Sequence, residues 1–150
     1  MSTLPAAVSL VLDTNVVLDW LVFRDPSSDA LAAALTTGRA EWLTCARMRD
    51  ELEHVLTRGA LDRWSPDAGA VFATWDRWAR LVAAPPPAPP GLRCTDPDDQ
   101  VFIDLALEHG ASALLSRDRA LLRLARAARR AGLQVLTPQA WTRSTFAQAA

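Results

Sequence analysis

The sequence predicts an α/β protein, a three-layer α/β/α sandwich with a central, mostly parallel, five-stranded sheet. Three observations support this fold class. Short β-rich segments alternate with segments of helical periodicity, an order that gives parallel strands and right-handed crossovers. The predicted strands are apolar at nearly every position, as expected of strands covered on both faces. The chain has 150 residues, 50% of them hydrophobic, which suffices for one domain with a core.

The elements predicted before residue 60 form two strand–helix units. Two runs of helical spacing end at or near a glycine, Gly38 and Gly59, and glycine is favoured just past the end of a helix. The predicted elements are a strand over 8–12, a helix after Thr14-Asn15 with Val16, Val17, Trp20 and Leu21 on one face, a helix over 28–37, a strand over 41–45 and a helix over 46–56.

The middle of the chain combines an aromatic helix with a proline-rich connector. A helix is predicted over 66–81 from its apolar face. That face consists of Val71, Phe72, Trp75, Trp78 and Leu81. We assign it to core packing rather than to base stacking, and any exposed aromatic members to a contact between two copies of the chain. A short strand is predicted over 81–83, and the prolines of 84–91 predict an extended, polyproline-like connector.

The last third of the chain repeats the alternation of helix and strand. Gly110 and Gly132 each follow a run of helical spacing and predict its end. The predicted elements are a helix over 98–109, a strand over 113–116, a helix over 118–131 and a strand over 133–136 that ends at Thr137-Pro138.

Composition and charge exclude several classes of protein. The 16 basic residues against 17 acidic ones leave a net charge of -1, so a strongly charged disordered chain is excluded and any nucleic-acid contact must come from a local patch. Two cysteines are too few for a disulfide scaffold and lack metal-ligand spacing. Residues 1–8 lack the pattern of a signal peptide, and no apolar run approaches the ~20 residues that span a bilayer. We therefore expect a cytoplasmic protein without a membrane partner.

Four acidic residues follow predicted strands or lie early in the helices behind them. They are Asp13 directly after the first strand, Glu51 about one turn into the helix after the second, Asp99 in the first turn of its helix, and Asp118 just after the 113–116 strand. In an open parallel sheet the functional crevice lies beyond the carboxyl ends of the strands. We therefore expect these four carboxylates to meet at one edge of the sheet.

Carboxylates that meet at one edge predict a metal site. They repel one another, and a divalent cation relieves the repulsion. Oxygen ligands without a Cys/His cluster favour Mg²⁺ or Mn²⁺ over Zn²⁺. Such a site suits phosphodiester hydrolysis, because a metal lowers the pKa of the attacking water and stabilises the leaving oxygen. The amide of Asn15 and the hydroxyls of Thr14 and Ser116 are candidates to orient the ligands.

Each acid also has a purely structural interpretation. Asp99 and Asp118 stand where helix N-caps and first-turn acids are favoured. Glu51 has acidic neighbours at positions 50 and 53 that compete for the same role. Asp13 is the least ordinary, because an acid that ends a buried apolar strand must be paired, hydrogen-bonded or bound to a metal.

These residues stand in motifs that resemble those of the PIN-domain ribonucleases. The segment over 8–16 resembles the opening motif of the family, a hydrophobic strand followed by Asp-Thr-Asn or Asp-Thr-Ser. The further matches, in the same order, are Glu51-Leu52-x-x-Val55-Leu56, Asp96-Pro97-Asp98-Asp99-Gln100-x-Phe102-x-x-x-Ala106, Ser116-Arg117-Asp118-x-x-Leu121-Leu122 and Leu136-Thr137-Pro138-Gln139-x-Trp141. Within the family, the resemblance points to the bacterial toxins of toxin–antitoxin pairs.

The resemblance implies a single PIN-like domain over 1–150, with its core at about 8–141, that cleaves RNA with one or two Mg²⁺ or Mn²⁺ ions. The catalytic metal ligands that it implies are Asp13, Glu51, Asp99 and Asp118. The supporting residues are Asn15, Thr14, Ser116 and Asp98, of which the last could share the metal role. It further implies two possible partners besides RNA, a cognate antitoxin and a second copy of the chain.

A run of arginines adjoins Asp118. Arg119, Arg123, Arg126 and Arg130 recur at helical spacing, with Arg117 nearby. One role is contact with RNA phosphates, for which the candidates are Arg117, Arg119 and Arg123. The other two roles are docking of an acidic antitoxin segment and a plain solvated helix face.

Two classes of function remain open at this point. The leading hypothesis is a metal-dependent endoribonuclease, the toxin of a type II toxin–antitoxin pair, or in a second version a housekeeping RNA-processing nuclease. The alternative is a non-catalytic module of the same fold whose acids only bind metal or nucleic acid or cap helices. Other acid-pocket α/β proteins fit poorly, because no second Asp follows Asp13 at the spacing of a phosphotransferase, the chain has no lysine for a receiver domain, and no glycine-rich turn follows the first strand.

Overall fold

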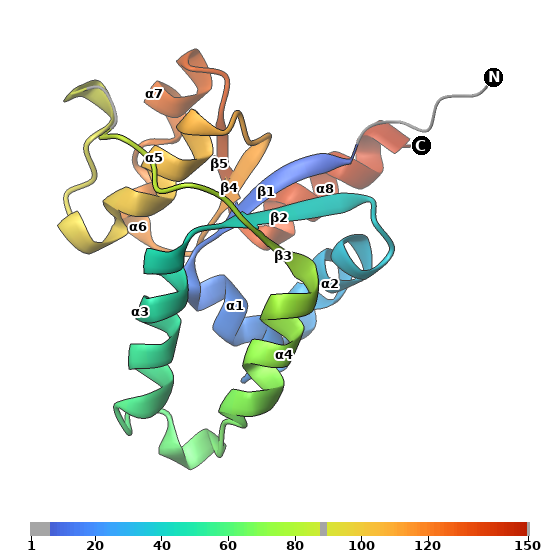
Figure 1. Cartoon of the computed structure of the whole chain (residues 1–150). Helices are drawn as coiled ribbons and strands as arrows, with labels where there is room; N and C mark the ends of the chain where they lie inside the picture. The colour runs from blue at the N-terminus through green and yellow to red at the C-terminus, as the bar shows by residue number, and fades with distance from the viewer. Residues whose placement is uncertain (1–6, 88–89, 150) are drawn as a thin grey trace.

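The predicted sheet is present in the structure, a computed structural model that describes residues 7–87 and 90–149. Within these residues five strands, all parallel, form one sheet in the order β3-β2-β1-β4-β5 (Figure 1). The strands are β1 (Val8–Leu12), β2 (Ala40–Thr44), β3 (Ala79–Leu81), β4 (Ala113–Leu115) and β5 (Gln134–Leu136). The fold class predicted from the alternation of elements is therefore confirmed.

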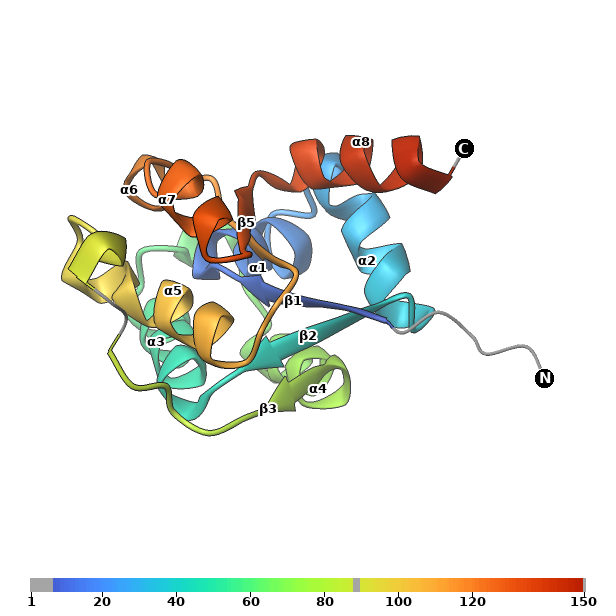
Figure 2. The ribbon, with the colours of Figure 1, turned by 90° about the horizontal axis from the view of Figure 1, so that it is seen from above.

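Helices cover both faces of the sheet. The α-helices of the described residues are α1 (Thr14–Leu21), α2 (Asp29–Thr36), α3 (Ala46–Thr57), α4 (Ala68–Trp78), α5 (Gln100–Glu108), α6 (Arg119–Leu122), α7 (Ala125–Arg130) and α8 (Pro138–Ala149). Single 3-10 turns are η1 (Pro26–Ser28), η2 (Asp62–Trp64), η3 (Pro90–Leu92) and η4 (Pro97–Asp99). Figure 1 shows α1, α3 and α4 on one side of the sheet and α5 and α7 on the other. Figure 2 shows α8 beside α2, with which it is in contact.

The core follows from the apolar strands. Leu10 and Val11 of β1 and Leu114 and Leu115 of β4 are completely buried, as expected of central strands with helices on both faces. On β2, Trp42 meets Trp75 of α4 edge-on, with 4.7 Å between ring centroids. The aromatic members of the face predicted for this helix, Phe72, Trp75 and Trp78, therefore pack against the core, the role we assigned to them. Leu81, which we assigned to the same face, instead lies on β3 and is 65% exposed.

The strand order creates a switch point beside β1. The chain passes from β1 to β2 and β3 on one side, and then returns to place β4 and β5 on the other side. Ligands of open parallel sheets bind at such a point, beyond the carboxyl ends of the two strands that flank it. Leu12 and Leu115 are partners in the last register pair of β1 and β4, so the residues that follow them emerge side by side.

Two elements in the middle of the chain, a helix and the strand after it, were predicted with wrong boundaries. The helix predicted over 66–81 begins at Ala68, because the side chain of Asp67 caps it by accepting a 3.0 Å hydrogen bond from the N–H of Ala70. It ends at Trp78, and the following strand begins at Ala79, which pairs with Trp42 of β2. The connector over 84–91 contains no helix or strand up to residue 87, but it ends in the 3-10 turn η3; residues 88–89 lie outside the described part.

The helix predicted over 118–131 is two short helices, α6 and α7. Between them the backbone makes a 3-10-type turn, in which the N–H of Leu124 donates to the carbonyl of Leu121. An α-helix would instead pair this N–H with the carbonyl of Ala120. Both helices contact β5, and Leu121 and Ala128 are completely buried. The helix α8 was missed, although Thr137-Pro138 is a typical start for a helix: the Thr137 hydroxyl accepts from the N–H of Ala140.

Candidate active site

Asp13 stands at the switch point of the sheet. Its backbone N–H donates to the carbonyl of Leu115 at 3.0 Å, so the hydrogen bonding of β1 with β4 continues up to this residue. Its side chain is buried, with 3% of the residue exposed. The Oδ2 atom accepts a 2.7 Å hydrogen bond from the hydroxyl of Ser116, which follows β4. The buried carboxylate of Asp13 is thus held in place by the Ser116 hydroxyl, its one side-chain donor among the described residues.

Ser116 connects Asp13 with Asp118. The same hydroxyl that donates to Asp13 accepts from the backbone N–H of Asp118 at 2.9 Å, and Ser116 is completely buried. The Oδ1 atom of Asp118 in turn accepts from the N–H of Ala120 at 2.8 Å and caps α6. The capping interpretation of Asp118 is therefore correct, and it does not separate Asp118 from Asp13.

Asp99 has no capping role. It lies at the junction of η4 and α5, is 8% exposed, and makes no side-chain cap hydrogen bond. Its Oδ2 atom is buried without a hydrogen-bond partner among the described residues. A buried carboxylate oxygen without a donor is costly unless a proton or a cation compensates it. This orphaned oxygen is the feature of the site that the helix-cap interpretation does not explain.

Glu51 approaches the same region from α3. Its Oε2 atom accepts a 2.7 Å hydrogen bond from the hydroxyl of Thr14, the first residue of α1. It also lines a cavity of about 390 Å³, to which Asp98 contributes from η4. The neighbouring acids Asp50 and Glu53 are exposed, which leaves Glu51 as the acid of α3 that faces Asp13.

Asp13 lies within electrostatic reach of each of the other three acids. Burial raises the pKa of Asp13 to about 6, against the hydrogen bond from Ser116, and the charges of Asp118 and Glu51 raise it further. Burial also raises the pKa of Asp99 to about 8, together with a hydrogen bond between its carboxyl group and that of Asp118 and with the charge of Asp13. In the metal-free protein, Asp13 and Asp99 therefore keep their protons to higher pH than ordinary carboxyl groups do.

The donor set suits a hard divalent cation. All four side chains offer only carboxylate oxygens, which are the ligands of Mg²⁺ and Mn²⁺, and the Oδ2 atom of Asp99 has no hydrogen-bond partner within the described residues. Within residues 7–87 and 90–149, however, no three His, Cys, Asp or Glu side chains form an arrangement that could hold a metal ion. The structure thus gathers the acids in one region, but their present side-chain positions do not form a ready coordination shell.

The remaining predicted residues take different positions. The side chain of Asn15 is exposed, and its backbone N–H, rather than its amide, acts on Asp13 by lowering the pKa of that carboxyl group. Arg119 and Arg123 are exposed on and after α6. Arg117 binds Asp19 of α1 through two hydrogen bonds, of 2.6 and 3.0 Å.

Asp19 is a residue that the sequence reasoning missed. It is 3% exposed, and burial raises its pKa although Arg117 opposes the shift. The available signal was an acid inside the apolar run over 16–23. The pair with Arg117 ties the middle of α1 to the loop that carries Asp118.

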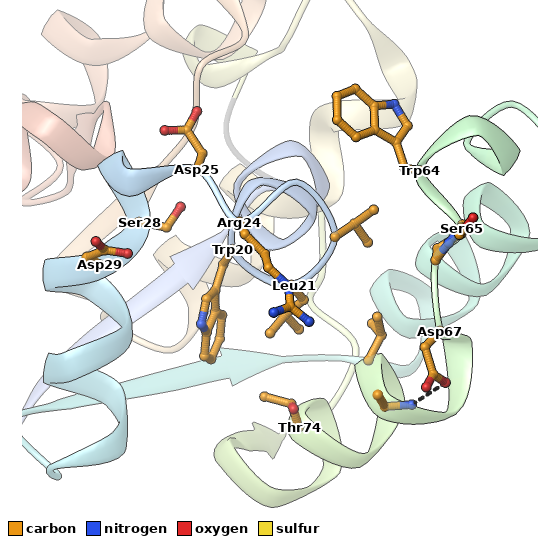
Figure 3. A pocket seen from close by; sticks show the side chains of 14 residues that line it. Trp20, Leu21, Arg24, Asp25, Ser28, Asp29, Trp64, Ser65, Asp67 and Thr74 are labelled. Atoms are coloured by element: carbon orange, nitrogen blue, oxygen red, sulfur yellow. Dashed lines mark hydrogen bonds between the residues drawn. The ribbon is translucent and has the colours of Figure 1, made fainter.

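A larger cavity, of about 500 Å³, lies away from the acids, between the end of α1 and the start of α4 (Figure 3). Its lining includes Trp20, Arg24, Trp64 and Ser65. Arg24 and Ser65 are the non-glycine residues with positive φ in the described part, at 52° and 47°. None of the predicted site residues lines this cavity, so it does not belong to the acid cluster.

Comparison with known proteins agrees with the motifs. The family model described as PIN domain matches residues 9–120, more than half of the chain. The matched range contains β4, all of β1 but its first residue, and all four acids. No curated protein matches the sequence. Among the helices of the described residues, none has the length and hydrophobicity to cross a bilayer.

Proposed function

The chain belongs to the PIN domain family, and from this premise we propose that it is a nuclease that hydrolyses RNA with the help of Mg²⁺ or Mn²⁺. The observation that carries the proposal is the buried Oδ2 atom of Asp99, which has no donor and lies near the carboxylates of Asp13 and Asp118. Such an arrangement favours a bound cation over a purely structural role, because helix capping leaves this oxygen unexplained.

In this proposal each side chain has a distinct task. Asp13, Asp99 and Asp118 hold the cation, and Glu51 completes the site from α3, where the Thr14 hydroxyl orients it. Ser116 fixes the Asp13 carboxylate by its 2.7 Å hydrogen bond. When bound, the cation supplies Lewis acidity, which makes water a better nucleophile at neutral pH and offsets charge at the phosphate. Burial of Asp13 and Asp99 lowers the local dielectric and strengthens each of these interactions.

Within this activity we propose the toxin of a type II toxin–antitoxin pair, acting in the cytoplasm. The motifs around all four acids support it, since they resemble those of the bacterial toxins of the family. The partners that we propose for this role are a cognate antitoxin and a second copy of the chain. A small reading frame directly upstream of the gene, whose product abolishes RNA cleavage, is the expected finding. An activity that no neighbouring product inhibits would favour a housekeeping nuclease.

The test of the nuclease is metal-dependent cleavage of a labelled single-stranded RNA. We expect cleavage in Mg²⁺ or Mn²⁺ that stops with EDTA, and a rate at least about 100-fold lower in Asp13→Asn and in Asp99→Asn. Asp50→Asn, an exposed acid on α3, is the matched control and should cleave like the parent. If both site variants cleave at the parent rate, the site assignment is wrong. Calorimetric metal binding by highly purified protein without any turnover would identify a non-catalytic module.

A further inference from the structure

A row of two arginines and a histidine, on α3 and at the residue that caps its C-terminal end, borders the acid cluster. The cavity of about 390 Å³ that Glu51 and Asp98 line is also lined by Arg47, His54 and Arg58. All three cationic or imidazole side chains belong to exposed residues. The cavity thus combines two acids with side chains that can bind phosphate.

The row follows from the periodicity of the helix. Positions 47, 51, 54 and 58 are separated by four, three and four residues, which places them on one face of an α-helix. The other side of α3 is apolar, and Met48, Leu52 and Leu56 are buried in the core. With a rise of 1.5 Å per residue, the row extends for about 16 Å along the helix. That length allows contact with more than one phosphate of a nucleic-acid strand.

These cations are not used inside the protein. Arg49, Arg80 and Arg117 each form an ion pair, with Asp76, Glu41 and Asp19 respectively. In the described part of the chain, neither Arg47 nor Arg58 has an acidic partner within 4.0 Å. Glu51, their neighbour on the same face, is hydrogen-bonded to Thr14. A ligand that enters the cavity therefore meets guanidinium groups that are free to bind it.

We propose that this α3 cation face, defined as Arg47, His54 and Arg58, binds phosphates of the RNA strand next to the phosphate that is cleaved. The inference rests on the proposed function, which it deepens by assigning the substrate-positioning surface. Guanidinium groups bind phosphate oxygens through paired hydrogen bonds, and the imidazole adds a further donor. The face also offsets the repulsion between the phosphates of RNA and the carboxylates of Glu51 and Asp98.

The α3 cation face accounts for binding better than the arginines near Asp118 do. Arg117 is held by Asp19 in two hydrogen bonds. The predicted continuous stripe is divided between α6 and α7, and none of its arginines lines the cavity beside Glu51. An RNA strand that enters this cavity meets the α3 cation face beside Glu51 and Asp98.

The experiment measures binding separately from cleavage. A fluorescent single-stranded RNA is titrated with the Asp13→Asn chain in Mg²⁺, with and without Arg47→Gln and Arg58→Gln together, and affinity is read by anisotropy at several salt concentrations. We expect the Kd of the double variant to rise about tenfold. The negative slope of log K against log salt should become shallower by about 1.4, since each contact with a single strand contributes about −0.7. In the cleaving parent, the same pair should raise KM more than it lowers kcat.

A charge-matched control removes two other exposed arginines, with Arg39→Gln before β2 and Arg143→Gln on α8. Circular dichroism and thermal melting verify that both double variants are folded. The inference fails if the α3 variant binds RNA like its parent, if the control weakens binding equally, or if polyglutamate of the same length displaces the RNA as well as unlabelled RNA does. If the parent cleaves RNA but its affinity does not change when Arg47 and Arg58 are replaced, only this inference is refuted. Protein that binds RNA through α3 without cleaving it refutes only the proposed nuclease.

Discussion

The hydroxyl of Ser116 joins two carboxylates of the candidate site, whereas the equally buried hydroxyl of Ser28 has no partner. This contrast gives a matched pair of substitutions. Ser116→Ala removes the donor to Asp13 and the acceptor of the Asp118 N–H, and should lower the free energy of unfolding by about 1–3 kcal/mol. Ser28→Ala removes an unpaired polar group and should leave stability unchanged or raised. Urea denaturation measures both, and equal losses would contradict the assigned hydrogen bonds.

The two raised carboxyl pKa values predict how stability depends on pH. In the folded, metal-free protein Asp13 and Asp99 keep their protons up to about pH 6 and about pH 8, against an ordinary value of 3.8. From about pH 4 up to about pH 8, the folded state binds more protons than the unfolded state. The free energy of unfolding therefore falls as pH rises through this range.

Urea denaturation in EDTA at pH 5 and pH 8.5 tests this dependence. We expect lower stability at pH 8.5, and recovery on addition of Mg²⁺. The double substitution of Asp13→Asn and Asp99→Asn should remove most of the difference. If the double variant keeps the full difference in stability between pH 5 and pH 8.5, that difference comes from groups other than Asp13 and Asp99.

For single residues, the sequence indicated which acids matter but not always which side chains they contact. Asp13 could be singled out from the sequence, because an acid that ends a buried strand requires a partner. The choice of Glu51 over Asp50 and Glu53 followed from family resemblance, and the structure supplies the reason, the hydrogen bond to Thr14. The partner of Asp19 was out of reach, because Arg117 is 98 residues away along the chain.

At the scale of elements, a glycine ends α2 as predicted. Gly38 has φ +79°, and a Cβ added there would meet nothing within 4 Å, so Gly38→Ala changes the backbone energy alone. We expect a loss of about 1 kcal/mol in the free energy of unfolding. Gly91→Ala is the control, since Gly91 has equal space and no positive φ, and should cause no loss. Thermal denaturation measures the stability of both variants. An equal loss in the two would contradict the claim that the positive φ of Gly38 causes the effect.

The elements that were predicted well are those with strong local patterns. The apolar run over 8–12 and the periodic segment of α3 agree with the structure almost to the residue. The break between α6 and α7 was missed because helical periodicity continues through it, while burial of Leu121 and Ala128 beside β5 decides where the backbone tightens. The strand β3 was placed two residues late, because its position is set by pairing with β2 rather than by its own composition.

At the scale of the whole molecule, the pair of Arg117 and Asp19 links the β4–α6 loop to α1. Arg117→Ala should lower the free energy of unfolding by about 2 kcal/mol, because it leaves the Asp19 carboxylate buried without its cation. Adding Asp19→Asn to that variant should restore part of the loss, since the uncompensated charge is then gone. Chemical denaturation of the two single variants and the double variant gives the coupling energy. Additive losses would show that the pair does not act as a unit.

The alternation of strands and helices, the apolar central strands and the acids at strand ends can all be predicted from the sequence. These features depend on periodicity and on the neighbours of each residue along the chain. Three other features arise only when the chain folds: Asp99 keeps an oxygen without a donor among the described residues, Arg117 is held by Asp19, and Arg47 and Arg58 lie beside Glu51. Each of these depends on which distant segments meet at the switch point, and contacts between distant segments leave no local pattern in the sequence.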